Sequence, residues 1–272
     1  MPYESVLRPG ERVFDDNNAY LLVTDPVIGG VQMSRGRVQR PAEVAGYGAD
    51  PTIDVIPRSE WPDRIEQMER EKSRISDVCD LAGLTVLDQN GTSYCWINAP
   101  THCVEIVRVM QGQPLVRLSP ASVGAPIKGY RNQGGWGTEG LRYIAEHGLV
   151  PQSLWPANAI DRKYDTAETQ AVRAQYRAIE WEELPDRNFD QMASYLLNGI
   201  PVAIGLNYWS HEVTAVDLVA LGGGKYGIRI DNSWGSGWET NGRGILTESK
   251  GTPDDACALR VATPSAAGTA AV

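Results

Sequence analysis

Two hydrophobic patterns follow one another along this chain and predict helices first and strands later. After Cys95, apolar side chains recur three and four residues apart, which is the spacing of one helix face over residues 95–112. Similar spacing predicts helices at 138–147, which Gly148 would end, 167–177 and 190–198. Segments that are rich in β-branched residues and separated by glycines predict strands at 201–206, 212–221, 226–230 and 244–248. This order favours an α+β protein whose helices and strands form two segregated lobes.

The first eighty residues and the last nine have weaker patterns. Residues 19–23 predict a short strand, whereas scattered glycine and proline favour loops up to residue 57. The charged segment 63–80 predicts an exposed helix with charge pairs at i,i+4 spacing. The small-residue tail from Pro264 onward is expected to be disordered.

We therefore divide the chain into an N-terminal extension (1–58), a main domain (59–262) and a flexible tail (263–272). The extension is interpreted first as an accessory segment packed on the surface or used for docking, because chain ends often have that role. Its alternative is an inhibitory segment that lies in a cleft.

Composition excludes several classes of protein. A net charge of −9 over 272 residues makes a nucleic-acid backbone an unsuitable partner. No apolar stretch reaches membrane-spanning length, and the N-terminus lacks the pattern of a secretory signal, so an intracellular or particle-associated protein is expected. The cysteines contain no CxxC pair, which argues against a disulfide framework or a zinc site. We expect no metal and no cofactor. The four cysteines are Cys79, Cys95, Cys103 and Cys257.

Cys95 is the strongest candidate for a reactive group. A polar, turn-rich loop over residues 88–93 delivers it to the start of the apolar helix. Unpaired backbone N–H groups and the helix dipole favour an anion at that position, so the thiol there ionises more easily. Gln89 could direct an amide N–H to the same place, and with the Cys95 backbone N–H it would form an oxyanion hole. Pro100 falls early in this helix, so we expect the helix to begin late or to be kinked.

A nucleophilic cysteine needs a base, and the chain has only three histidines. His211 precedes an apolar strand, and Asn232 follows another strand, so Asn232 could accept from one ring nitrogen and aim the other at Cys95. His102 lies on the central helix at an offset that points it away from Cys95, and a structural role is expected for it. Asp217 and Asp231 are expected to be solvated.

These residues, in this order, resemble the signature of the papain family of cysteine peptidases. The motifs are Gln89, Cys95-Trp96, His211 and Asn232-Ser233-Trp234-Gly235. Three further segments resemble the family in the same order: 118–120, 133–136 and 154–156. The resemblance implies a papain-like α+β fold, in which a helical lobe with a central nucleophile helix faces a β-barrel-like lobe across an active-site cleft. It implies hydrolysis of peptide bonds in a polypeptide substrate by Cys95, His211, Asn232 and Gln89.

The resemblance also implies a substrate-binding region. Gly134 and Gly135 would pair with the substrate backbone, and Trp136 and Trp209 would offer an apolar wall. Several features depart from the family. Thr92 and Asn132 stand where its near-nucleophile disulfide would be, the usual propeptide pattern is absent, and Glu212 replaces the usual small residue. The segment before His211 is short, so the family's specificity is not implied.

Two other functions stay open. The fold could serve as a structural or binding component of a larger particle, for instance a viral one, with weak or no catalysis, in which the extension contacts an assembly partner. Acyl transfer of the transglutaminase kind also uses a Cys-Trp pair and a histidine. That chemistry expects an aspartate partner, so Asn232 disfavours it.

Overall fold

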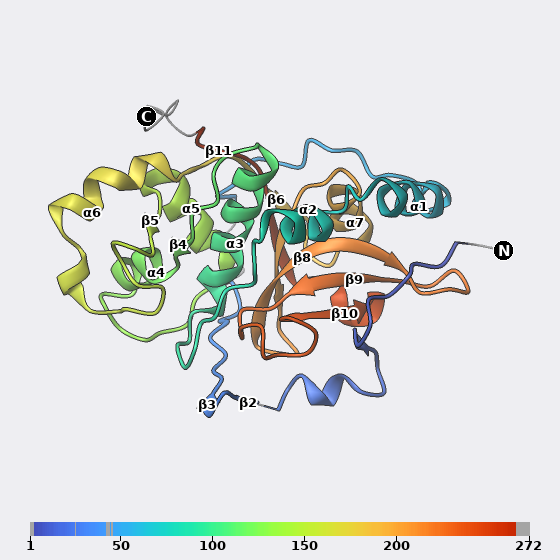
Figure 1. The fold of residues 1–272 in the computed structure, drawn as a ribbon, viewed down its shortest axis with the longest axis horizontal. Helices are drawn as coiled ribbons and strands as arrows, with labels where there is room; N and C mark the ends of the chain where they lie inside the picture. The colour runs from blue at the N-terminus through green and yellow to red at the C-terminus, as the bar shows by residue number, and fades with distance from the viewer. Residues whose placement is uncertain (1–2, 25, 42–43, 45, 265–272) are drawn as a thin grey trace.

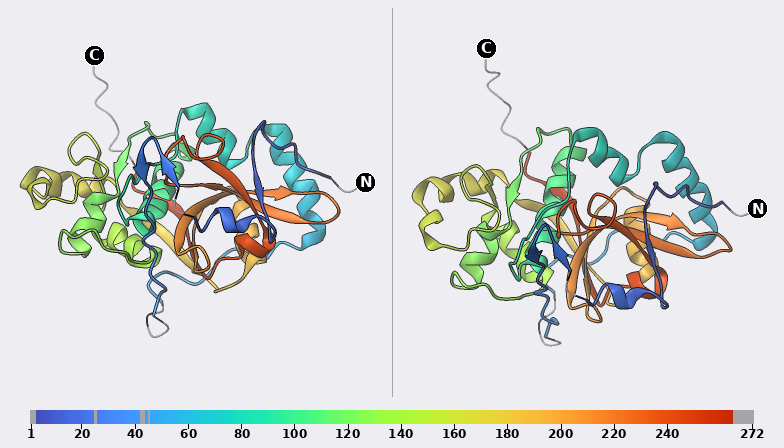
Figure 2. Two further views of the ribbon diagram at one scale, coloured as in Figure 1. Left: turned by 90° about the horizontal axis from the view of Figure 1, so that it is seen from below. Right: turned by 60° about the horizontal axis from the view of Figure 1, so that its bottom comes forward.

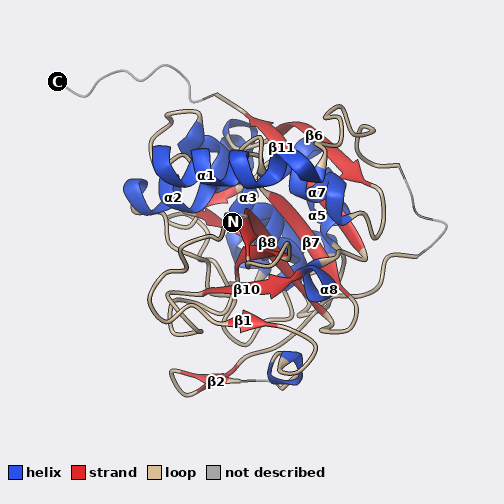
Figure 3. Cartoon of the chain, turned by 90° about the vertical axis from the view of Figure 1, so that its right-hand side faces the viewer, coloured by secondary structure: helices blue, strands red, loops and turns tan. Residues whose placement is uncertain are grey.

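The computed structural model describes residues 3–24, 26–41, 44 and 46–264, and a seven-stranded sheet dominates one half of it. The strand order is β1-β10-β9-β8-β7-β11-β6, with every neighbouring pair antiparallel except β1 and β10. The strands are β1 (Val13–Phe14), β6 (Ala178–Leu184), β7 (Val202–Leu206), β8 (His211–Ala220), β9 (Tyr226–Asp231), β10 (Arg243–Thr247) and β11 (Asp255–Ala262). Figure 3 shows the strands of this sheet from another side, with most of the helices gathered above them in that view.

The other half is helical, and helix α3 (Cys95–Met110) separates it from the sheet (Figure 1). Beyond α3 lie α4 (Ala121–Ile127), α5 (Gly137–His147) and α6 (Ala167–Val172), with the short pair β4 (Leu118–Ser119) and β5 (Val150–Pro151). Around the sheet lie α1 (Trp61–Glu71), α2 (Ile75–Ala82), α7 (Phe189–Leu196) and α8 (Glu248–Gly251). One buried hydrophobic cluster lies in the sheet half, and a second joins the helical half to residues of β6, β7 and β11. The expected α+β fold with two lobes is confirmed.

The central helix begins at Cys95 in spite of Pro100, which lies inside it. It does not begin late, because every side chain from Cys95 to Arg108 is buried between the two lobes. Burial on all sides removes water from a helix and favours its internal hydrogen bonds, so tertiary packing outweighs the cost of the proline. The thiol of Cys95 is thereby fixed at the N-terminal end of the helix.

Most predicted elements are present, within two residues at each end. The helix predicted over 167–177 ends at Val172, and a 3-10 helix follows it over Arg173–Gln175. The predicted strand at 19–23 is wrong, since residues Ala19–Leu21 form a 3-10 helix. The Asp15 carboxylate accepts from the N–H groups of Asn17 and Asn18, and this local bonding turns the chain where apolar content had indicated a strand.

The single exposed helix predicted over 63–80 is also wrong. Two helices occur there, because Lys72 adopts a left-handed conformation (φ 56°) that ends α1. Their inner faces are buried, with Trp61 and Ile65 at 0% and 1% exposure. The pattern missed β6 and β11, whose alanine- and glutamate-rich sequences have low strand propensity and depend on pairing with each other. Of the predicted tail over 263–272, residues 265–272 lie outside the described residues.

The N-terminal residues are part of the half that contains the sheet, which we name the barrel-like lobe. Strand β1 extends the sheet by parallel pairing with β10, and Phe14 stacks on Trp238 with ring centroids 6.0 Å apart. The backbone N–H of Ser5 donates to the carbonyl of Ala220, 2.9 Å away. Residues 27–32 then form the hairpin β2 (Val27–Ile28) and β3 (Val31–Gln32), after which the chain runs between the two lobes (Figure 2).

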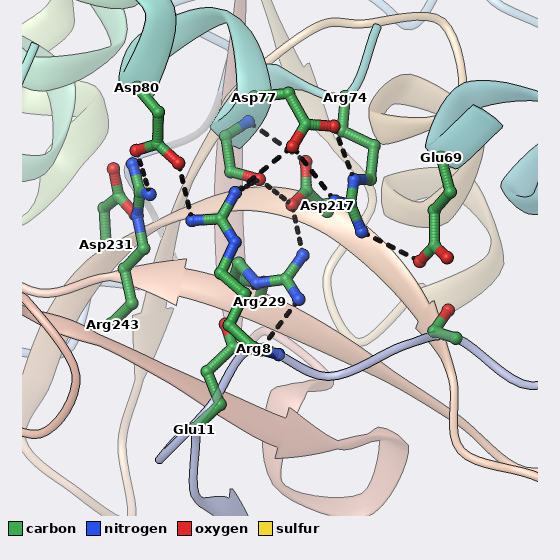
Figure 4. Close-up of polar contacts among 12 residues, drawn as sticks. Arg8, Glu11, Glu69, Arg74, Asp77, Asp80, Asp217, Arg229, Asp231 and Arg243 are labelled. Atoms are coloured by element: carbon green, nitrogen blue, oxygen red, sulfur yellow. Dashed lines mark hydrogen bonds and ion pairs between the residues drawn. The ribbon is translucent and has the colours of Figure 1, made fainter. Parts of the chain in front are cut away.

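Buried ion pairs fix this N-terminal segment to the sheet (Figure 4). The guanidinium of Arg229, fully buried, lies between the carboxylates of Glu11 and Asp217, each at 2.5 Å. Arg243 pairs in the same way with Asp231, at 2.7 Å. The prediction that Asp217 and Asp231 are solvated is therefore wrong, because each is paired with a buried arginine that the sequence pattern did not reveal.

Candidate active site

Cys95 lies at the junction of the two lobes with no exposed surface. Burial raises the pKa of its thiol to about 12, and the negative charge of Glu212 acts in the same direction. Backbone N–H groups of Gly36, Glu212 and Trp96 act against this and lower the pKa. The backbone N–H of Glu212 faces the sulfur, and Glu212 directly follows His211, so the sulfur lies beside the first residues of β8.

The His211 imidazole is hydrogen-bonded to Asn232. Its Nε2 donates to the Asn232 Oδ1 at 2.8 Å, and its Nδ1 has no partner. Burial lowers the pKa of His211 to about 3, so the ring is neutral in this state and Nδ1 carries a free lone pair. The ring packs against Trp234 and Trp209, with centroid distances of 4.6 and 4.7 Å. These indoles exclude water from the His–Asn hydrogen bond.

Gln89 is positioned by the same loop that carries Asn232. Its Oε1 accepts from the Ser233 hydroxyl at 2.6 Å, and its backbone N–H donates to the Ser233 carbonyl at 2.8 Å. With the oxygen fixed, Nε2 donates to two carbonyls, those of Thr92 at 2.7 Å and Ser34 at 2.8 Å. The amide N–H of Gln89 is thus directed at a carbonyl oxygen that comes from another segment.

That segment comprises residues 34–38, which we name the strap. The Gly36 N–H donates to the sulfur of Cys95 at 3.2 Å. On the helical lobe, Gly135 donates to the Gly36 carbonyl at 2.9 Å and accepts from the Val38 N–H at 2.8 Å. On the barrel lobe, the Arg37 N–H donates to the Ser210 carbonyl at 3.3 Å. The strap therefore occupies the space between the lobes and covers the thiol.

Close packing at glycines sets the depth of the strap. A Cβ added to Gly36 would lie 1.8 Å from the Ser93 carbonyl oxygen, and one added to Gly134 would lie 2.2 Å from the Gly36 oxygen. The strap group that contacts the sulfur is the N–H of Gly36, which is a donor. The strap carbonyl that Gln89 holds belongs to Ser34, two residues before Gly36. Since no single peptide bond of the strap presents its carbonyl to both groups, the strap is not bound as a cleavable peptide.

The residues expected to bind substrate have different surroundings. Gly134 and Gly135 line the strap, and Trp136 is half-buried with the Lys128 ammonium 5.3 Å from its ring centroid. Trp209 is fully buried behind the His211 ring, so its side chain forms packing and not an exposed wall. Its carbonyl instead accepts from Arg35 of the strap at 3.3 Å.

Where the family has its disulfide, a hydrogen bond joins the same two segments of this chain. The backbone N–H of Ser93, the neighbour of Thr92, donates to the Asn132 Oδ1 at 2.7 Å. All four cysteines are free and buried. Within the described ranges, no group of three or more His, Cys, Asp or Glu side chains could hold a metal ion, and no helix is long and apolar enough to cross a membrane.

His102 has the structural role that its helical offset predicted. It lies between Glu105, 3.2 Å from its Nδ1, and Asp231, 3.0 Å from its Nε2. No local sequence pattern indicated the strap, or Arg37 and Asp255, which form an ion pair beside Glu212. These contacts join segments up to 218 residues apart, and only the fold brings them together.

Comparisons with known proteins point in one direction. A cysteine protease of Blomia tropicalis is 24% identical over 197 residues, which cover 61% of this chain and 58% of that protein. The chain thus spans less than two thirds of this curated relative. No family model matches the chain.

Solved structures with the same fold include xylellain, a cysteine protease from Xylella fastidiosa. It is 15% identical with a TM-score of 0.58, and the match covers 88% of this chain and 98% of xylellain. A recombinant stem bromelain precursor is 19% identical, with a TM-score of 0.59 and coverage of 81% and 78%. Digestive procathepsin L 3 of the Tenebrio molitor larval midgut is 21% identical, with a TM-score of 0.56 and coverage of 65% and 66%. In fold, and more distantly in sequence, this chain is similar to the papain-like cysteine proteases.

Proposed function

We propose that this protein is a cysteine peptidase and that the strap holds it in a self-inhibited state. Cys95 attacks a peptide carbonyl, and the developing oxyanion is held by Gln89 Nε2 and the Cys95 backbone N–H. His211 receives the thiol proton and donates it to the leaving amine, after which it activates water. Asn232 keeps the imidazole oriented through the proposed cycle.

The observation that carries this proposal is the hydrogen bond from Gln89 Nε2 to the Ser34 carbonyl at 2.8 Å. It supports an oxyanion role, because a fully buried amide donor is directed at a peptide oxygen of the strap, two residues before the N–H that contacts the thiol. The unpartnered Nδ1 of His211 supports a base whose other nitrogen is already committed to Asn232.

Self-inhibition follows from access and from ionisation. While the strap is bound, Cys95 has no exposed surface and its thiol is protonated at neutral pH. When the strap leaves, water and substrate reach the sulfur, the desolvation that raises its pKa falls, and proton transfer to His211 becomes favourable.

The experiment compares the full chain with its Gly36→Leu variant. A leucine cannot fit against the Ser93 carbonyl, so the strap is displaced. We expect the variant to hydrolyse a mixed peptide library at least tenfold faster than the wild type and to react faster with an epoxide thiol probe. Gln39→Ala, which truncates an exposed side chain beside the strap, is the matched control and should behave like the wild type.

Cys95→Ala in the Gly36→Leu background should abolish both hydrolysis and labelling. Hydrolysis that persists without the thiol would disprove the mechanism. If Gly36→Leu labels rapidly at Cys95 but cleaves no peptide, the chain is better described as a binding component of the papain-like fold.

A further inference from the structure

The side chain of Arg37 fills a pocket of the barrel-like lobe beside the strap. Only 1% of this side chain is exposed. Its Nη2 donates to the Asp255 carboxylate at 2.6 Å, and its Nη1 lies 3.9 Å from the Glu212 carboxylate. Both carboxylates are buried, with side-chain exposures of 6% and 1%.

The sheet itself builds this pocket. Gly205 on β7 stands directly opposite Glu212 on β8 and also directly opposite Asp255 on β11. Side chains of directly opposed residues project from the same face of a sheet, so the two carboxylates flank the glycine. A Cβ added to Gly205 would lie 2.4 Å from the Arg37 guanidinium carbon, and the missing side chain is therefore what makes room for the cation.

Arg37 does not satisfy all the buried polar atoms of the pocket. The Glu212 Oε2 and the Arg37 Nε and Nη1 are buried without a hydrogen-bond partner. Burial raises the pKa of Glu212 well above its ordinary value, and Asp255 adds to this while Arg37 opposes it. A guanidinium that entered in another orientation could use both carboxylates, which is the geometry that arginine suits best.

The backbone beside the pocket is the surface expected to bind substrate. Arg37 pairs with Gly135 in a parallel bridge, through the Gly36 carbonyl and the Val38 N–H. When the strap leaves, Gly135 regains a free donor and acceptor, and Glu212 and Asp255 lose their shared cation. Two carboxylates buried together without a cation are unfavourable, so the opened site favours a positively charged replacement.

We propose that Glu212 and Asp255 make this a peptidase that selects a basic residue, arginine over lysine, where the substrate backbone pairs with Gly135. This inference rests on the proposed peptidase function. Arg37 then blocks the site with the kind of side chain that the substrate supplies.

The test uses the full chain and its Arg37→Ala variant, in which the pocket is vacated. Fluorogenic peptides vary each of the four residues before the cleaved bond in turn, with arginine, lysine, leucine or citrulline. Citrulline is the neutral isostere of arginine. At one of these four peptide positions, we expect kcat/KM to be at least tenfold higher for arginine than for citrulline or leucine. The kcat/KM for lysine at that position should be intermediate.

Variants of the two carboxylates identify the cause. Glu212→Gln and Asp255→Asn should each reduce the arginine-to-citrulline ratio toward one. Glu180→Gln removes an exposed carboxylate from strand β6 and should keep the wild-type ratio. Should either pocket variant fail to fold, the arginine-to-citrulline ratio of the proteins that keep both Glu212 and Asp255 still shows whether a basic residue is selected.

The two hypotheses fail in different ways. If peptides are cleaved without any preference for a basic residue, the specificity inference is overturned and the peptidase function stands. If the full chain, Arg37→Ala and Gly36→Leu cleave no peptide at all, the proposed function is overturned and this inference with it.

Discussion

At the residue scale, the sequence indicated the candidate reacting groups because their chemistry depends on residue type at few positions. Cys95, His211, Asn232 and Gln89 each sit beside a turn that marks the end of a helix or strand, and turns are readable from glycine, asparagine and serine. Strand alternation directs the Glu212 side chain away from that of His211, and Glu212 is not among the groups that shift the pKa of His211. Its actual partner, Arg37, was invisible because it lies 175 residues earlier in the chain.

The ionisation of Cys95 leads to a prediction that needs no substrate. A thiol whose pKa is about 12 is protonated throughout the neutral range. As long as the pH stays below that pKa, the thiolate fraction rises roughly tenfold for each unit by which the pH increases. Alkylation of Cys95 in the full chain should therefore rise steadily from pH 6 to pH 9 without a plateau.

In Gly36→Leu, where His211 can receive the proton, the alkylation rate should reach its plateau below pH 8. The measurement is iodoacetamide labelling followed by mass spectrometry, with Cys95→Ala as the blank for the other three cysteines. A plateau at the same pH in both proteins would show that the strap does not control the thiol.

At the element scale, periodicity predicted those helices and strands that bury an apolar face. It failed where polar contacts between distant segments decide the conformation, as in β1, which is a two-residue strand that β10 stabilises. Glu11, just before it, has a fully buried carboxylate paired with the equally buried Arg229. Although burial opposes the effect, hydrogen bonds from Arg229 lower the pKa of Glu11 below its ordinary value.

Removal of the Glu11 carboxylate should therefore destabilise the whole protein. Glu11→Ala leaves Arg229 buried with only Asp217, and we expect a loss of about 3–5 kcal/mol in the free energy of unfolding. Because the pKa of Glu11 is lowered by folding, its contribution is present above the unfolded value near 4.5 and is lost as the pH falls through the folded value.

Urea unfolding of the wild type and the variant at pH 7 measures this difference, and repetition at decreasing pH should show that it shrinks. Arg12→Ala is the control, since its half-exposed pair with Glu239 should be worth less than about 1 kcal/mol. Equal small losses in the two variants would mean that the N-terminal segment is not an integral part of the sheet.

At the scale of the whole molecule, the strap is fixed at both ends. Before it, β1 and the Glu11–Arg229 pair join the N-terminal residues to the barrel-like lobe. After it, the N–H groups of Gly46 and Tyr47 donate to the Glu183 carboxylate, and Ala49 bridges to Glu182 on β6. An inhibitory segment held in this way does not dissociate when the chain is cut once upstream of it.

A single cut between β2 and β3 tests this arrangement. Gly29 and Gly30 form the exposed turn of that hairpin, and a recognition sequence for a specific protease can be inserted between them. After cleavage, the N-terminal fragment should co-elute with the rest of the protein on size exclusion and separate from it only in denaturant. Cys95 should stay slow to alkylate, because the strap is still joined to the residues that follow it and still paired with Gly135. Release of the fragment under native conditions, together with rapid labelling of Cys95, would instead mean that the N-terminal residues act as a detachable inhibitor.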